Sequence, residues 1–441
     1  RAKSNLLELK KFKENGTYEY IIYETIKSYN NLFLNDIIDS DQENFGKLSL
    51  ITSAFQNCYK NSDKTNDYFI NLINTDDGDY SRYIFFYLSN LANEKNFDEM
   101  RNISSSIEPL SNSLLISQAK EWIDASKFKK FTKHFSCKSS EDLLAEFFFL
   151  ISNLYSSQEE YQKSNFYLNI SNYLNPKFYF NLALLAENYV YNENFESAKK
   201  IYNKFDNNDL VYRWYKIKQI AKIIEEKENK DKALLFVENE FKKIKNPSIK
   251  ILFDLANIYK RNKKYIKSIE YYSNILLSLE KNSDTYASIL YRRGGSYERL
   301  GNYESSDKDL IHSLEINPDA PYVLNYLAYS WLERKYKIDE AIKMLDKAYS
   351  QKKDDPYIID SVGWGYYLIG DYSNAEKYIK KAVILMPDDP IVNDHYGDIL
   401  WMLDRKLQAK YFWENVLNLE SSDDEMKKKI KEKLLNGPNK I

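Results

Sequence analysis

Small side chains return along this chain at nearly constant intervals, each within an apolar stripe of helical spacing. The first series of eight is Ser152, Ala186, Ala221, Ala256, Gly294, Ala328, Gly363 and Gly397, with steps of 34, 35, 35, 38, 34, 35 and 34 positions. A second series follows 12 or 13 positions after each: Ser164, Ala198, Ala233, Ser268, Ser306, Ala341, Ala375 and Ala409. This pattern predicts two helices per unit, because small residues allow paired helices to approach closely.

One unit, from Pro356 to Asp389, shows the pattern clearly. Its first helix carries an apolar stripe formed by Ile359, Val362, Gly363 and Tyr366, and its second helix carries Ala375, Ile379 and Ala382. Gly370 and Asp371 are expected to form the turn between the two helices. Proline cannot continue a helical hydrogen-bond ladder, so we expect Pro176, Pro318 and Pro387 to end second helices.

The pattern weakens toward the start of the chain. Further units are expected around Leu9 to Ser28, Ala54 to Ile73, Leu88 to Ile107 and Ala119 to Lys133, with longer loops at Asn74 to Asp79 and Ser136 to Glu141. At the other end, Ser422 to Asp424 is typical of a helix start. The lysine-rich segment from Met426 to Leu435 is predicted to be a solvated capping helix on the last repeat.

These observations predict an all-α fold, a right-handed α-solenoid of helix-turn-helix repeats. A period near 34 residues with two helices is the signature of the tetratricopeptide repeat, and we expect about eight clear units and up to 12 in total. The sequence is divided into degenerate N-terminal helical repeats (1–140), clear repeats (141–280), well-formed C-terminal repeats (281–420), and a capping helix with a tail (421–441).

Composition agrees with a helical, folded chain and gives little information on partners. Gly (11) and Pro (9) are scarce among 441 residues, which favours long helices. The net charge is −2, from 63 Lys plus Arg against 65 Asp plus Glu, so no overall field attracts nucleic acid or an anionic membrane.

No segment is long and apolar enough to suggest a membrane-spanning helix. The longest apolar run, about Ala145 to Ile151, is far shorter than the ~20 residues required. Because the sequence begins at Arg1 without Met, a signal peptide or a lipid-acceptor cysteine would lie upstream. The sequence therefore leaves both an envelope and a cytoplasmic location open.

Cys58 and Cys137 are the only cysteines. If helices stack in simple succession, the two residues lie two repeats apart, too far for a disulfide, so both are expected to be partly buried free thiols. His134 lies three positions before Cys137, but no second ligand pair accompanies them. We therefore expect no metal and no other cofactor.

The last 150 residues resemble a family of tetratricopeptide proteins best known from alphaproteobacteria. The segments that carry the resemblance are Tyr291 to Gly294 with Tyr297 to Arg299, Tyr322 to Trp331, Ile359 to Tyr367, and Asn393 to Asp398 with Trp401. This family is similar in its C-terminal repeats to an outer-membrane lipoprotein adaptor of a carboxyl-terminal processing protease. The resemblance implies a scaffold in the cell envelope, in the periplasm or at the outer membrane. Ala328, Lys353 and Arg293 depart from the family's pattern.

A second stripe of each first helix is predicted to face a partner. It lies at offsets −6, −3, +1 and +4 from the small residue, on the expected concave surface. In the last three units these positions hold Tyr322, Asn325, Tyr329 and Leu332; Tyr357, Asp360, Trp364 and Tyr367; and Ile391, Asp394, Asp398 and Trp401. We refer to these positions as the first-helix stripe.

The chemistry of this stripe suits an extended peptide. Asn325, Asp360 and Asp394 share one offset, so they are expected to form a ladder that accepts backbone or lysine donors. The aromatic residues, with Trp364 at the centre, are of the kind that dominates binding hot spots. The alternative interpretation is that the aromatics pack between repeats and the acids cap helices. A clamp for a C-terminal carboxylate is not expected here, because it needs Lys and Arg.

Other classes of protein fit less well. Helical-repeat RNA-binding proteins have a similar period, but Asp360, Asp394 and Asp398 would repel phosphate. No phosphate loop, paired-histidine motif or nucleophile elbow suggests an enzyme, and His395 beside Asp394 lacks a closed pocket. We therefore predict a non-catalytic scaffold that binds a protein or peptide, either as an envelope adaptor with a membrane-anchored partner or an upstream lipid anchor, or as a cytoplasmic assembly scaffold.

Overall fold

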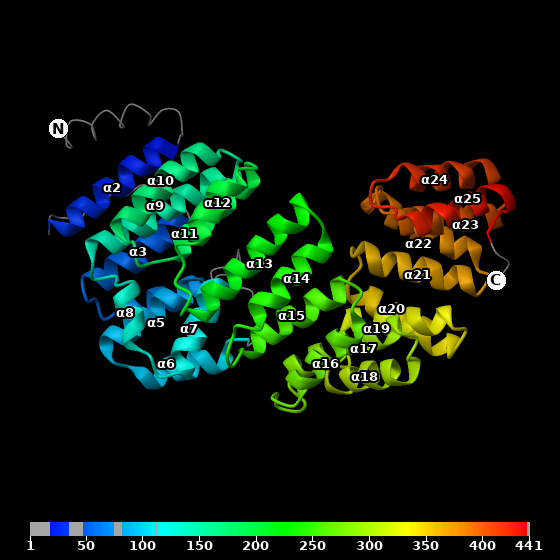
Figure 1. Cartoon of the computed structure of the whole chain (residues 1–441), viewed down its shortest axis with the longest axis horizontal. Coiled ribbons are helices and arrows are strands. Elements are labelled where there is room, and N and C mark those ends of the chain that lie inside the picture. Colours follow the sequence, from blue (N-terminus) through cyan, green and yellow to red (C-terminus); the bar gives the residue numbers. More distant parts are fainter. Residues whose placement is uncertain (1–17, 35–46, 75–81, 109, 111–112, 439–441) are drawn as a thin grey trace. The chain divides into compact units, whose positions relative to one another are not determined.

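The computed structural model describes residues 18–34, 47–74, 82–108, 110 and 113–438. These residues form 24 α-helices and no strand, which confirms the predicted all-α fold (Figure 1). The chain separates into two compact units, Arg1–Lys250 and Ile251–Ile441, called unit 1 and unit 2 below. The divisions predicted after residues 140, 280 and 420 follow the clarity of the repeat and remain a prediction.

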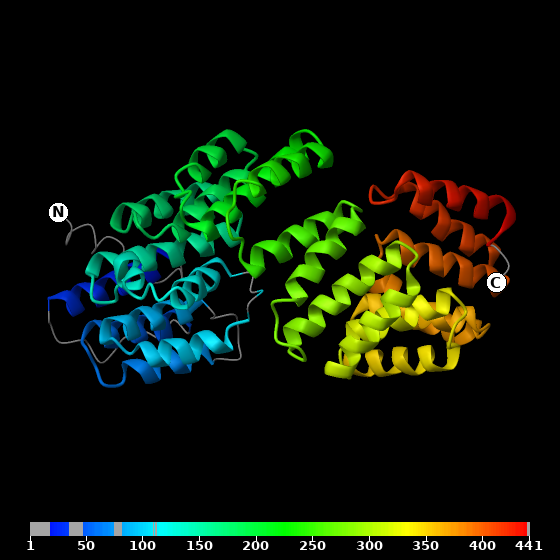
Figure 2. The same ribbon diagram turned by 60° about the horizontal axis from the view of Figure 1, so that its bottom comes forward.

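Unit 2 consists of five helix pairs and a final single helix (Figures 1 and 2). The first helices of the pairs are α15 (Ile249–Arg261), α17 (Asp284–Arg299), α19 (Pro321–Glu333), α21 (Pro356–Leu368) and α23 (Pro390–Met402). Their partners are α16 (Tyr265–Leu276), α18 (Tyr303–Ile316), α20 (Ile338–Gln351), α22 (Tyr372–Leu385) and α24 (Lys406–Asn418), followed by α25 (Asp424–Asn436). From α17 onward, each first helix packs on its own second helix, and the next first helix packs on both.

Small residues lie at the closest contacts of these pairs. All sixteen of the small positions in the two series are buried. A Cβ atom on Gly363 would lie 3.0 Å from the backbone nitrogen of Ile379 in α22, and one on Gly397 would overlap the Trp413 ring in α24. The predicted reason for the repeat, close helix approach, is therefore confirmed at these pairs.

In seven of the eight pairs that carry both small residues, the turn contains a left-handed residue seven positions after the first small residue; the exception is Glu228, with φ of −126°. Gly301 and Gly370 occupy this position with φ of +73° and +84°. Other pairs place a non-glycine residue there with positive φ: Glu159, Glu193, Lys263, Lys335 and Asp404. The left-handed region costs an L-residue free energy, so these five turns are held by packing of the helices around them.

Helix ends agree with the sequence in several places. The helices α10, α18 and α22 each end two residues before the predicted proline. Asp423 caps α25 by accepting a hydrogen bond from the Met426 backbone N–H, as expected for a helix start. Arg293, a departure from the family's pattern, forms two hydrogen bonds to Asp309, of 2.7 and 2.8 Å, between α17 and α18.

Unit 1 contains three clear repeats after a less regular beginning. The clear pairs are α9 (Ser140–Ser157) with α10 (Tyr161–Leu174), α11 (Phe180–Tyr191) with α12 (Phe195–Tyr202), and α13 (Leu210–Lys227) with α14 (Lys230–Phe241). The earlier helices are α2 (Tyr18–Phe33), α3 (Lys47–Tyr59), α4 (Thr65–Ile73), α5 (Arg82–Glu94), α6 (Phe97–Ser106), α7 (Leu114–Asp124) and α8 (Lys129–His134). The pairs α3–α4, α5–α6 and α7–α8 fall at three predicted units. In the predicted unit at Leu9 to Ser28, residues 18–28 form part of α2 and the earlier ones lie outside the described residues, as does the predicted loop after Asn74.

The beginning of unit 1 does not stack in simple succession. The helix α2 packs against α9, where the rings of Tyr18 and Tyr155 lie 5.4 Å apart. Arg82 at the start of α5 forms a 2.5 Å ion pair with the buried Glu146 of α9. Burial raises the Glu146 pKa to about 7, against the lowering effect of Arg82. The front helices therefore fold back onto the first clear repeat.

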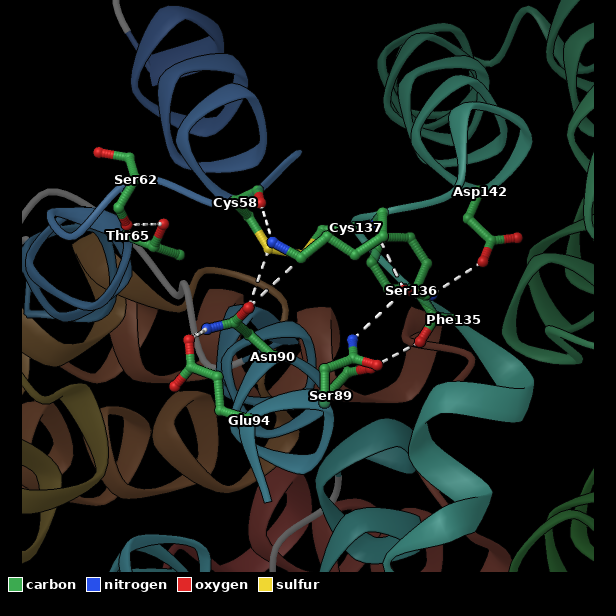
Figure 3. The surroundings of a disulfide bond; sticks show 12 residues. Cys58, Ser62, Thr65, Ser89, Asn90, Glu94, Phe135, Ser136, Cys137 and Asp142 are labelled. Atoms are coloured by element: carbon green, nitrogen blue, oxygen red, sulfur yellow. Dashed lines mark hydrogen bonds between the residues drawn. A yellow bond between two sulfur atoms is a disulfide. The ribbon is translucent and has the colours of Figure 1, made fainter. Parts of the chain in front are cut away.

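This return of the chain overturns the prediction of two free thiols. Cys58, at the end of α3, and Cys137, in the loop between α8 and α9, form a disulfide with Cα atoms 5.9 Å apart (Figure 3). Asn90 of α5 points at the pair, with its Oδ1 3.1 Å from Cys58 Sγ (Figure 3). The prediction was wrong because it assumed linear stacking, whereas both cysteines meet beside α5. It also removes Cys137 as a metal ligand.

Candidate interaction surface

Three successive first helices present the stripe in a fixed register. Each of α19, α21 and α23 has proline at its first position, where the missing N–H costs no helical hydrogen bond. The Asp355 and Asp389 side chains cap α21 and α23 by accepting hydrogen bonds from two backbone N–H groups each. The residue after each proline therefore stands at the same place in its repeat.

These residues form an exposed row. Tyr322, Tyr357 and Ile391 have exposed fractions of 49, 62 and 52%. The Tyr322 hydroxyl donates a 3.0 Å hydrogen bond to Asp355, which also caps the next helix. Three large side chains at one offset in successive repeats create apolar surface that the described residues of unit 2 leave about half exposed. We call Tyr322, Tyr357 and Ile391 the exposed row.

Asn325, Asp360 and Asp394 lie at the same offset in successive repeats, as predicted. The two carboxylates, however, already have partners within the protein. Asp360 is buried and lies 2.9 Å from His395 Nδ1. Asp394 is buried and accepts a 2.5 Å hydrogen bond from Lys433. Asn325 is half-buried, and its Oδ1 has no hydrogen-bond partner among the described residues. The two carboxylates are thus paired within the protein rather than open to a ligand.

Lys433 corrects the prediction of a fully solvated capping helix. Its ammonium lies 2.5 Å from Asp394 and 2.7 Å from Asp398, and all three side chains are at most 9% exposed. Ile430, on the same helix, is also buried. One face of α25 therefore seals the last repeat, because two buried carboxylates require a cation nearby.

Asp398 remains electrostatically strained in this arrangement. Burial, followed by the neighbouring Asp394, raises the Asp398 pKa to about 6, and the Lys433 ammonium works in the opposite direction. The Trp413 indole also donates a 3.2 Å hydrogen bond to Asp398. Asp398 therefore acts as part of the internal network between α23, α24 and α25.

The aromatic members of the stripe form stacks. Trp364 lies between Tyr367 and His395, with ring centroids 4.5 and 3.9 Å away and interplanar angles of 18° and 13°. Its Nε1 donates a 2.5 Å hydrogen bond to Glu333 of the preceding repeat. Tyr367 is buried, whereas Trp364 is half-buried. Trp364 therefore has one accessible part while it links three repeats.

Tyr329 and Trp401 are also half-buried. Burial, with Glu333 and Asp360 nearby, raises the Tyr329 pKa. The Trp401 ring lies 5.4 Å from the Trp413 ring at an angle of 34°, and Gly437, with φ of +79°, packs against the Trp401 ring. Many of the aromatic and acidic side chains that the sequence suggested as ligand contacts therefore contact other residues of the protein instead.

Sequence reasoning missed the internal partners of the stripe. Lys433, Glu333 and the pairing role of His395 did not enter the predicted surface. His395 lies two positions before its small residue, so the repeat register could have placed it between α21 and α23. Lys433 gave no such signal, because α25 has no second helix that fixes its register.

Among the described residues, no group of three or more His, Cys, Asp or Glu side chains is arranged to hold a metal ion. In the same part of the chain, no helix combines the length and apolarity needed to cross a bilayer.

The comparisons with known proteins agree with the geometry. The tetratricopeptide repeat family model matches residues 287–320, the unit that begins in α17. The TPR repeat-containing protein PA4667 of Pseudomonas aeruginosa is 32% identical over 111 residues, which are 25% of this chain and 19% of that protein. The chain therefore spans about a fifth of this relative's length.

Solved structures with similar folds include a tetratricopeptide repeat protein from Parabacteroides merdae, with a TM-score of 0.47 and 19% identity, covering 57% of this chain and 97% of that one. TTC0263, a thermophilic TPR protein of Thermus thermophilus, has a TM-score of 0.38 and 16% identity, covering 43% of this chain and 100% of that one. The specific similarity to a protease adaptor is not among these findings. The matched tetratricopeptide repeat lies within an array of helix pairs whose small residues are buried at the same positions, so the chain contains a repeat similar to those of tetratricopeptide repeat proteins.

Proposed function

We propose that this protein is an adaptor that holds a protein or an extended peptide along the first helices α19, α21 and α23. The exposed row carries this proposal, because three large apolar side chains recur at one offset on a rigid scaffold. Rigid aromatic anchors of this kind supply much of the free energy of binding at protein interfaces. Trp364 and Trp401, which are half-buried, would extend the contact beside the row.

The polar part of the proposed contact differs from the sequence-based hypothesis. Asp360, Asp394 and Asp398 have internal partners, so we assign them to the architecture beneath the contact. Asn325 keeps an acceptor without a partner among the described residues.

We further propose that the protein works in the cell envelope. The disulfide supports this location, because disulfides persist in oxidising compartments such as the periplasm and are rare in the cytosol. The resemblance of the last 150 residues to the adaptor family points the same way. Recruitment of substrates to a processing protease rests on that resemblance alone.

A crosslinking experiment in living cells tests the binding face. A photoreactive amino acid replaces Tyr357 in the row, and in a matched control it replaces Tyr411, which is 68% exposed on the second helix α24. We expect one discrete crosslinked protein from position 357 and none of the same mass from position 411. Equal crosslinking from both positions would refute the assignment of the face.

The location has its own test. Cells are treated with a thiol-alkylating mass tag before and after reduction, and Cys58 and Cys137 are then scored by mobility of the protein. We expect tagging only after reduction, and release of the protein with the envelope fraction. Tagging without reduction would favour the cytoplasmic scaffold.

A further inference from the structure

Trp364 contacts three other side chains, and one of them can change its charge near neutral pH. The Trp364 ring stacks on Tyr367 of its own helix and on His395 of α23, and its Nε1 donates a hydrogen bond to Glu333 of α19. Histidine is the residue whose ordinary pKa lies closest to neutrality. The protonation state of His395 therefore acts directly on Trp364, whose ring is half-buried.

His395 is also in contact with Asp360. Both side chains are at most 9% exposed, and His395 Nδ1 lies 2.9 and 3.2 Å from the two carboxylate oxygens of Asp360. A buried carboxylate is costly without a cation beside it, so Asp360 favours the imidazolium form of His395. A positive ring is also attracted to the face of an indole, and the ring centroids of His395 and Trp364 lie 3.9 Å apart. Loss of the proton therefore weakens both contacts that position His395.

The charges around His395 favour its protonated form. Asp360 faces it from α21, and Asp394 and Asp398 lie beside it on α23. The other charged or titratable groups that interact with these residues or with Trp364 are Lys433 of α25, Tyr367 of α21, and Tyr329 and Glu333 of α19. The three aspartates are buried, and Lys433 is the permanent cation among the groups just named. Burial lowers the His395 pKa, but Asp360, then Asp394 and Asp398, raise it by more.

We propose that His395 is a positioning residue whose protonated ring holds Trp364 in the orientation that meets the partner, so that capture strengthens when His395 takes up a proton. A contact that is ordered before binding loses less entropy on binding, which raises affinity. By linkage, partner binding must in turn favour the proton on His395. This inference rests on the proposed function and adds a pH dependence to it.

Indole N–H signals test the positioning step on the full chain without a partner. The six tryptophans are labelled with ¹⁵N, and the Trp364 signal is assigned by its loss in Trp364→Phe. We expect this signal to follow the imidazole titration of His395, and His395→Gln to abolish the response. Asp398→Asn removes the neighbouring carboxylate, whose pKa burial and Asp394 raise to about 6. This control should keep the response with a lower midpoint, because Asp398 raises the His395 pKa.

Affinity tests the capture step with the partner identified from position 357. Between about pH 6 and pH 8, binding by the parent should weaken on the order of fivefold as His395 loses its proton, the size of one cation–π contact. His395→Gln keeps a hydrogen-bonding side chain without a titrating charge, so its affinity should lack this step. His312→Gln, on α18, is the matched control and should keep the parent profile. Titration of the partner itself is common to all three proteins and cancels in the comparison.

The parent alone also provides a test, which does not depend on the folding of His395→Gln. The chain has three histidines, so the ¹³C-labelled imidazole signal of His395 is assigned by elimination from His134→Gln and His312→Gln. We expect the His395 signal to titrate at a higher pH with saturating partner than without it.

Each outcome decides the proposal. A Trp364 signal that does not follow the His395 titration would overturn the positioning role. A His395 midpoint that the partner leaves unchanged, or equal pH profiles of the parent and His395→Gln, would overturn the coupling to capture, while a crosslink at position 357 keeps the proposed function intact. Failure to crosslink at position 357 would instead refute the proposed function, and the pH-dependent capture with it.

Discussion

The Lys433 ammonium lies 2.5 Å from the Asp394 carboxylate, although the two residues are 39 positions apart. The same ammonium also contacts both carboxylate oxygens of Asp398. This contact ties the last helix to the first helix of the final pair. It turns two residues that the sequence presented as ligand acceptors into part of the fold.

Replacing this ammonium should destabilise unit 2. Lys433→Met leaves two buried carboxylates without their cation, which is expected to cost about 3–5 kcal/mol. Thermal unfolding measures the effect, and Lys431→Met, an exposed lysine on the same helix, is the control. Adding Asp394→Asn and Asp398→Asn to Lys433→Met should restore part of the loss. An unchanged melting temperature in Lys433→Met would contradict the pairing.

His395 should make stability depend on pH. Burial lowers the His395 pKa, but Asp360, then Asp394 and Asp398, outweigh it, so the net shift is upward. An unfolded histidine titrates near ~6.5, so this contribution is complete below that pH and is lost as pH rises through the folded-state pKa. The melting temperature should therefore fall between about pH 6 and pH 8.

His395→Gln should remove this part of the pH dependence, whereas His312→Gln should keep it. Asp398, whose folded-state pKa is raised to about 6, weakens the fold as pH rises from about 4 through 6 and is still partly protonated at pH 6, so the His395 contribution is taken as the difference in slope between the parent and His395→Gln. A slope in His395→Gln equal to that of the parent would rule out the His395–Asp360 pair as its source.

The exposed row should be separable from stability. Replacing Tyr322, Tyr357 and Ile391 together by Ala removes side chains that are about half exposed, so the melting temperature should change little. Affinity for the partner captured from position 357 should fall at least about tenfold, since anchors of this kind each contribute on the order of 1–2 kcal/mol. Calorimetry with the purified partner measures it, and Tyr411→Ala is the control. Parent-like affinity in the triple variant would exclude the row.

The disulfide should stabilise unit 1. Cys58 and Cys137 are 79 positions apart, and a bridge across a loop of this length is expected to contribute about 2–4 kcal/mol. Reductant should lower the melting temperature of the parent. The double variant Cys58→Ala, Cys137→Ala should have a melting temperature close to that of the reduced parent, and reductant should not change it. Insensitivity of the parent would mean that the bond is not formed in the purified protein.

The left-handed turns offer a stabilising change. Lys335 has φ of +52° at a position where other turns use glycine. Relief of the backbone strain should exceed the added chain entropy, so Lys335→Gly is expected to gain about 0.5–1 kcal/mol. Gly370→Ala at the equivalent turn should lose a similar amount. Chemical denaturation measures the free energy of unfolding of both variants. If both changes had the same sign, the assignment of a left-handed residue to these turns would be contradicted.

The repeat itself was predictable because it depends on local spacing. The small residues, the prolines that begin or end helices, and the cap at Asp423 all follow from rules that act over a few turns of helix. The common offset of Tyr322 and Tyr357 in successive repeats follows from the same local spacing. These parts of the fold need no knowledge of distant contacts.

The remaining features depend on contacts between distant segments. Cys58 lies beside Cys137 because the first helices of unit 1 pack back onto α9. The spacing of the two cysteines in the sequence does not predict this packing. Asp394 and Asp398 were predicted to face a ligand. Their partner Lys433 could not be predicted, because it lies on a helix outside the repeat register. Charge in a stripe predicts a surface only when no other segment neutralises it.

The helix α25 also covers one face of the helix pair that precedes it. Tetratricopeptide units present a receptive face to the following unit, so an uncapped end invites the next chain to stack upon it. By inserting Ile430 and Lys433, α25 occupies that face with its own side chains. A variant truncated before Asp424 would expose the Asp394 and Asp398 carboxylates that Lys433 now covers, and we expect it to self-associate more readily than the parent.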